Sequence, residues 1–115
     1  MIRAFYGVQA ALVPAWWAWV LLVPSVHDWF FPVDLPPHLV RGFLIPDLLV
    51  LTGGSLLMAF RPRVVVAWCL TGGWAYASLL CFVWWVRSPD MWPGMVAMLL
   101  AAALNLGLAV GESVR

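Results

Sequence analysis

Three long stretches without a charged side chain constrain the fold of this chain more than any other feature. No Asp, Glu, Lys or Arg occurs within residues 4–27, 64–86 or 91–111. Each stretch is longer than 20 residues, which is about the length that a helix needs to cross about 30 Å of hydrocarbon. The sequence therefore predicts three transmembrane helices.

A fourth apolar stretch, residues 42–60, is nearly as long and contains one charged residue, Asp47. Hydrophobic residues make up 65% of the chain and charged residues 10%, whereas soluble domains carry about 25% charged residues. So much apolar surface requires lipid as the surrounding solvent. We therefore predict an all-α fold, a four-transmembrane-helix bundle with antiparallel up-down topology and short loops. It is one domain, residues 1–115, with spans at about 4–26, 35–60, 64–86 and 89–110.

The distribution of arginine predicts the orientation of these spans. With four spans, both termini and the turn at residues 61–63 share one side of the membrane, where four arginines stand against Glu112, a balance of +3. The other side has two arginines and three aspartates, a balance of −1. Because cytoplasmic loops are rich in Lys and Arg, both termini are expected in the cytoplasm, with the protein integral to a bacterial inner membrane. The net charge of +1 argues against nucleic acid as a partner, since such binding needs a basic face.

Short turns between spans allow the depth of residues to be compared. Residues at equal distance from Pro62 lie at equal depth, which sets two copies of Leu-Thr-Gly-Gly, at 51–54 and 70–73, opposite each other. The same comparison across the other connections brings one polar residue from each span into a common layer: Gln9, Thr52, Thr71 and Asn105. Because polar side chains bond between membrane helices, we interpret this layer mainly as a structural one.

Small residues at similar depth predict close helix packing. Without a bulky side chain, two helix backbones approach each other closely in a membrane. The positions expected to do so are Gly53, Gly54, Gly72 and Gly73 in the middle spans, and Ala103, Gly107 and Gly111 in the last span.

Asp47 is a charged residue that lies inside an apolar stretch and not at the end of a span. Depth comparison places it level with Tyr76 and Ser78, slightly outside the midplane. A charged carboxylate there costs at least about 2.5–3.5 kcal/mol, so Asp47 must be protonated, paired or facing a wet cavity. In one interpretation, Pro46 and Asp47 begin a shorter helix, and the carboxylate interacts with the N–H groups of the first turn.

In the other interpretation, Asp47 is an intramembrane acid that serves a proton or a ligand. Three tryptophans, Trp16, Trp17 and Trp74, lie at similar depth. A carboxylate among aromatic faces suits a hydrophobic cation through charge pairing and cation–π contact. The sequence leaves both interpretations open.

The connection between the first two spans contains imidazole and carboxylate groups, which are possible metal ligands. They are His27, Asp28, Asp34 and His38. Their spacing matches no compact ligand motif, so no metal site is predicted, and His27 and His38 are the nearest candidates. No cofactor is evident, since His27 lies outside the spans and His38 lies in the first turn of the second span, which is expected at the membrane interface. The chain contains no Lys, and no nucleophile–base set is visible.

In length and number of spans the chain resembles the small multidrug resistance transporters. The resemblance is one of architecture: that family carries its essential membrane acid in the first helix, where this chain has Gln9 and no acid.

Three functions follow from these features. The favoured one is a non-catalytic subunit of a membrane complex or a lipid-binding module, because nine tryptophans accompany almost no soluble surface. One alternative is a proton-coupled transporter of hydrophobic cations or small amphiphiles that uses Asp47. The other is an enzyme acting on a membrane lipid. The expected partners are the lipid bilayer and either further copies of this chain or a larger membrane complex.

Overall fold

The structure is a computed structural model that describes residues 2–26, 42, 44–87 and 92–114. The elements in chain order are α1 (Ile2–Leu22), the π-helical segment η1 (Asp47–Thr52), α4 (Gly53–Phe60), α5 (Val64–Arg87) and α6 (Trp92–Ser113). Each of these elements is helical, which confirms the prediction of an all-α fold for the described part of the chain.

Three helices are long and apolar enough to cross a membrane: Ile2–Leu22, Val64–Val83 and Trp92–Ser113. A shorter apolar helix, Leu44–Phe60, comprises η1 and α4 with the three residues before them. Together these helices indicate an integral membrane protein. The predicted second span at 35–60 is described continuously only from Leu44 onwards.

Proline determines where the first helix ends. α1 ends at Leu22, four residues before the predicted boundary, and Pro24 follows closely. A proline has no N–H to donate and its ring crowds the preceding turn, so a regular helix does not continue through it. Pro14, in contrast, lies inside α1.

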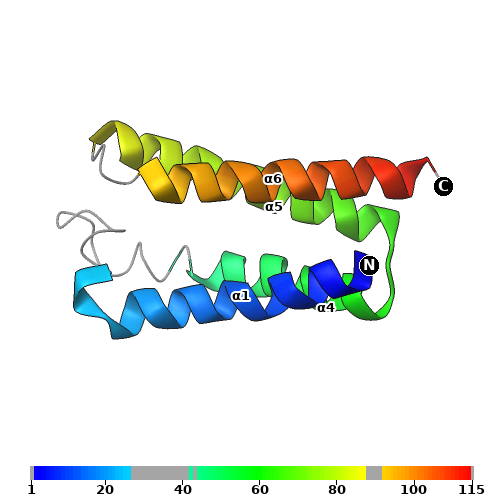
Figure 1. The fold of residues 1–115 in the computed structure, drawn as a ribbon, viewed down its shortest axis with the longest axis horizontal. Helices are drawn as coiled ribbons and strands as arrows, with labels where there is room; N and C mark the ends of the chain where they lie inside the picture. Colours follow the sequence, from blue (N-terminus) through cyan, green and yellow to red (C-terminus); the bar gives the residue numbers. More distant parts are fainter. Residues whose placement is uncertain (1, 27–41, 43, 88–91, 115) are drawn as a thin grey trace.

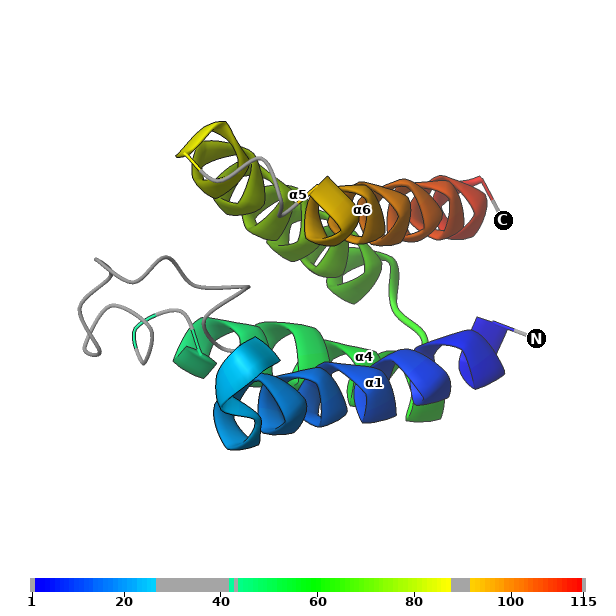
Figure 2. The same ribbon diagram turned by 60° about the vertical axis from the view of Figure 1, so that its left-hand side comes forward.

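The helices are arranged in two layers (Figures 1 and 2). α1 lies beside η1 and α4 in one layer, and α5 lies beside α6 in the other. The turn at residues 61–63 joins the layers at one end, and both chain termini lie at that end (Figure 1). Away from this end α5 and the Leu44–Phe60 helix diverge (Figure 2), and α1 and α6 stay apart.

Two glycines allow the layers to interlock. A Cβ atom on Gly54 would lie 2.8 Å from Cδ2 of Leu70, and one on Gly73 would lie 2.9 Å from Cδ2 of Leu51. The leucine of each Leu-Thr-Gly-Gly copy therefore packs into the second glycine of the other copy. Both leucines are almost fully buried, so this reciprocal contact fixes the position of α5 against η1 and α4.

The other predicted packing positions do not form such contacts. A Cβ atom on Gly53, Gly72, Gly107 or Gly111 would meet nothing within 4 Å, and Ala103 is exposed. Neighbouring residues of a helix point about 100° apart. Only one glycine of each Gly-Gly pair can therefore face the partner helix, and Ala103, Gly107 and Gly111 lie on the exposed side of α6.

A buried hydrogen-bonded cluster connects three helices near the middle of the molecule. Gln9 Nε2 donates to Ser55 Oγ at 2.8 Å, and Asn105 Nδ2 donates to Gln9 Oε1 at 2.8 Å. All three side chains are buried. The cluster joins α1 to α4 within one layer and to α6 across the layers.

Two of the residues predicted for this polar layer do not take part in it. Thr52 Oγ1 is buried and has no hydrogen-bond partner among the described residues. Thr71 Oγ1 donates to Ala67 O within its own helix, at 2.9 Å. Ser55 faces Gln9 where Thr52 was expected. Thr52 and Ser55 lie about one helical turn apart, and the long connection between the first two helices does not fix their relative height, which explains the offset.

Candidate functional site: a cleft between α1 and α6

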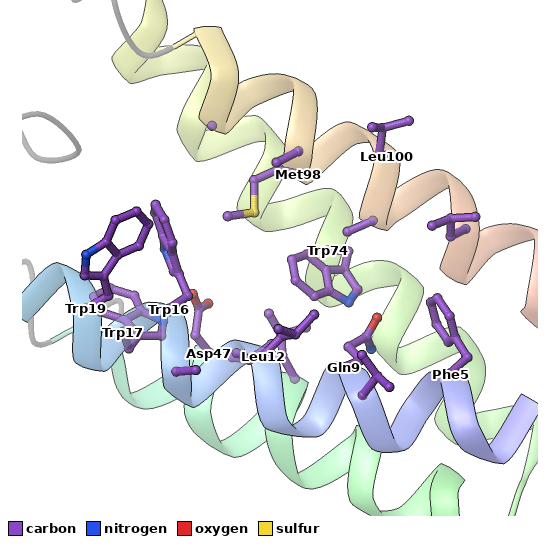
Figure 3. Close-up of a pocket in the computed structure, with 18 of the residues that line it drawn as sticks. Phe5, Gln9, Leu12, Trp16, Trp17, Trp19, Asp47, Trp74, Met98 and Leu100 are labelled. Atoms are coloured by element: carbon purple, nitrogen blue, oxygen red, sulfur yellow. Dashed lines mark hydrogen bonds between the residues drawn. The ribbon is translucent and has the colours of Figure 1, made fainter. Parts of the chain in front are cut away.

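An open cleft of about 920 Å³ lies between α1 and α6. Its floor contains Asp47 and Leu51 from η1 and Trp74 from α5. The α1 wall includes Phe5, Gln9, Leu12, Trp16, Trp17 and Trp19, and the α6 wall includes Gly94, Ala97, Met98, Ala101 and Leu104 (Figure 3). Apart from the tryptophans, Gln9 and Asp47 are the polar side chains among these described residues, so the cleft is almost entirely apolar.

The carboxylate of Asp47 is held by a tryptophan of the neighbouring helix. Trp17 Nε1 donates to Asp47 Oδ2 at 3.2 Å, which connects α1 to η1. Trp17 is buried and Asp47 is half-buried. A single neutral donor orients the carboxylate without cancelling its charge, so Asp47 presents an acid at the floor of the cleft.

The helix around Asp47 is unusual in its backbone. Asp47 is the first residue of the π-helical segment, and Pro46 before it is already helical, with φ −59° and ψ −41°. The described helix begins at Leu44, so Asp47 does not lie at its first residue. Its side chain bonds across to α1. π-helical segments are rare and occur often at functional sites, which favours the interpretation of Asp47 as a working acid.

Aromatic side chains gather at the same end of the cleft. The rings of Trp16 and Trp19 meet edge to face, with their centroids 5.6 Å apart. In Figure 3 these two rings stand above Asp47 and Trp17. The acid therefore lies beside several aromatic faces from α1.

Toward the other end of the cleft, Gln9 and Phe5 line the α1 wall, and Trp74 lies between them and Asp47 (Figure 3). Gln9 belongs to the cluster with Ser55 and Asn105 that joins α1 to α6. Trp74 is 9% exposed, and its Nε1 has no hydrogen-bond partner among the described residues. The cleft thus extends from an acidic and aromatic end at Asp47 to the interhelical cluster at Gln9.

Sequence reasoning placed Tyr76 and Ser78 level with Asp47, and neither of them lines the cleft. Tyr76 is 55% exposed on the outside of α5. Ser78 is buried, and its hydroxyl donates to Trp74 O within its own helix at 2.9 Å. Comparison of depth gives the height of a residue along a helix but not its direction around the helix. Tyr76 follows Trp74 by two residues and so points about 200° away from it.

The structure does bring Asp47, Trp16, Trp17 and Trp74 together around one cleft. Sequence reasoning missed the wall from α6, including Ala97, Met98 and Leu104. These residues are apolar, and Asn105 is the one polar side chain between residues 91 and 111, so periodicity could not distinguish the cleft face from the lipid face.

The possible metal ligands of the first connection, His27, Asp28, Asp34 and His38, lie outside the described residues. Within the described ranges, no three His, Cys, Asp or Glu side chains are grouped closely enough to hold a metal ion.

Comparison of the chain with protein-family models, curated proteins and solved structures finds no match. The resemblance to the small multidrug resistance transporters therefore rests on length and number of spans alone.

Proposed function

We propose that this chain is a non-catalytic membrane protein that binds an amphiphilic molecule from the bilayer in the cleft between α1 and α6. The cleft itself carries the proposal. Its volume of about 920 Å³ is in the range of sites for small-molecule ligands. Its apolar lining suits an alkyl chain or a fused-ring body.

The direction of the opening supports a ligand that arrives through the membrane. Both walls belong to helices that are long and apolar enough to span a bilayer. A gap between two spanning helices opens sideways, toward lipid, and not toward water. A molecule dissolved in the bilayer can therefore enter without crossing an aqueous phase.

The proposal includes a four-span antiparallel bundle with both termini in the cytoplasm. Support comes from the common end that the termini share with the turn at residues 61–63 (Figure 1), and from the arginines near that end. We expect a fluorescent reporter fused to the C-terminus to be active in the cytoplasm. A reporter that matures only outside the cytoplasm should be inactive at the same position. The opposite pattern would reverse the topology.

Filling the cleft should abolish binding. We expect Ala97→Trp to reduce crosslinking of a photoactivatable single-tailed lipid, in nanodiscs, by at least about fivefold, because the indole would occupy the space between the walls. Ala103→Trp is the matched control. Both alanines are exposed residues of α6, but only Ala97 lines the cleft. Equal crosslinking of the Ala97→Trp variant and the unmodified protein would exclude the cleft as the binding site.

A further inference from the structure

The polar end of the cleft indicates which head group its ligand carries. Asp47 Oδ2 accepts its bond from Trp17, a neutral donor. Among the described residues no hydrogen bond involves Oδ1. Lipid solvates a charged group poorly. A carboxylate inside a membrane protein is therefore stabilised when a cation pairs with it or a proton neutralises it.

No basic side chain described in the structure is placed to neutralise Asp47. The described arginine side chains belong to the first turn of α1 and to the turn at residues 61–63, at the end of the molecule that holds the termini (Figure 1). Asp47 lies at the other end of the α4 layer, in η1. Among the described residues no side chain supplies a compensating charge, so a cation that occupies the cleft would meet an uncompensated acid there.

The surrounding aromatic rings favour a cation for the same position. Trp17 holds the carboxylate, and Trp16 and Trp19 complete the wall beside it. Tryptophan is the strongest of the aromatic side chains in cation–π contacts. An ammonium group at this end would meet a carboxylate and indole faces together.

The same features disfavour a phospholipid head group. A phosphate attached next to the ammonium would bring a second negative charge close to Asp47. The described lining contains no Arg or Lys to receive it, and like charges in a desolvated site repel strongly. The site therefore discriminates between an ammonium amphiphile and a zwitterionic phospholipid.

We infer that the cleft binds a membrane-dissolved amphiphile of net charge +1, with its ammonium head at Asp47 and its apolar body toward Met98 and Leu104. This inference rests on the proposed function, since it names the head group of the ligand for the same cleft.

The test compares three single-tailed probes with the full-length protein in phosphatidylcholine nanodiscs. They are hexadecyltrimethylammonium, its neutral analogue with carbon in place of nitrogen, and hexadecylphosphocholine. Binding is measured with radiolabelled probe, and the signal of empty nanodiscs is subtracted. We expect the ammonium probe to bind at least about tenfold more tightly than either of the others.

Asp47→Asn provides the decisive variant, because an asparagine oxygen can still accept the bond from Trp17. We expect it to weaken binding of the ammonium probe by at least about tenfold and to leave binding of the neutral probe unchanged, which shows that the cleft is intact. Mass spectrometry of lipids that co-purify with the protein from cells should detect a long-chain amine.

The outcomes separate the two proposals. Equal binding of the neutral and ammonium probes, or an unchanged affinity in Asp47→Asn, would overturn the inference about charge and leave the cleft as an amphiphile site. Tight binding of hexadecylphosphocholine would overturn the requirement for net positive charge. Failure of all three probes to bind the unmodified protein would overturn the proposed function itself.

Discussion

Replacing Gly54 with leucine should destabilise the protein by about 1–3 kcal/mol, the usual range for overpacking of a dense core. A Cβ atom at this position would lie 2.8 Å from Cδ2 of Leu70 and 3.1 Å from its Cγ. Leu70 is fully buried, so it cannot turn outward to make room. The added side chain would have to push α5 away from α4.

Gly53→Leu is the matched control in the same helix. A Cβ atom on Gly53 meets nothing within 4 Å, so we expect the stability to change by less than about 0.5 kcal/mol. The pair Gly73→Leu and Gly72→Leu repeats the comparison from the side of α5, with Leu51 as the residue that would be displaced. Unfolding in detergent titrated with a denaturing surfactant gives the free energies. Equal effects within either pair would show that the two layers do not interlock at these glycines.

The location of this contact could be anticipated from the sequence, because the turn at residues 61–63 is short. A tight turn fixes the register of the two helices that it joins, and Leu51 and Gly73, like Leu70 and Gly54, lie at equal distances from Pro62. The choice of the facing glycine in each pair could not be anticipated. It depends on the rotation of each helix about its own axis, and an apolar helix in lipid gives no polar stripe to reveal that rotation.

The register between α1 and the Leu44–Phe60 helix was harder to predict. A long connection separates these helices, so no tight turn fixes their relative height. As a result, Gln9 meets Ser55 and not Thr52, an offset of one helical turn.

The candidate site, too, could be predicted from the sequence only in part. Asp47 could be identified from the sequence because a carboxylate in an apolar stretch is costly, and the tryptophans near it because they lie at similar depth. The α6 wall could not be identified from the sequence. Its residues Ala97, Met98 and Leu104 are apolar, like their neighbours that face lipid. Only the gap between α1 and α6 distinguishes them.

Gln9→Leu should also destabilise the protein substantially, by about 1–3 kcal/mol. Gln9 donates to Ser55 Oγ and accepts from Asn105 Nδ2, each at 2.8 Å. It therefore joins α1 to two helices, and it bridges α1 to α6 beside an open cleft where the two helices otherwise pack little. Leucine removes these two bonds and a third, from Gln9 Nε2 to Asn105 Oδ1 at 3.3 Å, so this oxygen loses its partner from α1.

Thr71→Val is the control for loss of a polar group at this level of the membrane. Thr71 bonds within its own helix, so we expect its replacement to cost less than about 0.5 kcal/mol. The double variant Gln9→Leu with Asn105→Leu should be less destabilised than the sum of the single variants, because neither amide is then left buried and unpaired. Strict additivity would mean that the two amides do not stabilise the contact between α1 and α6. The cleft would then be held open by packing around Leu51 and Leu70 alone.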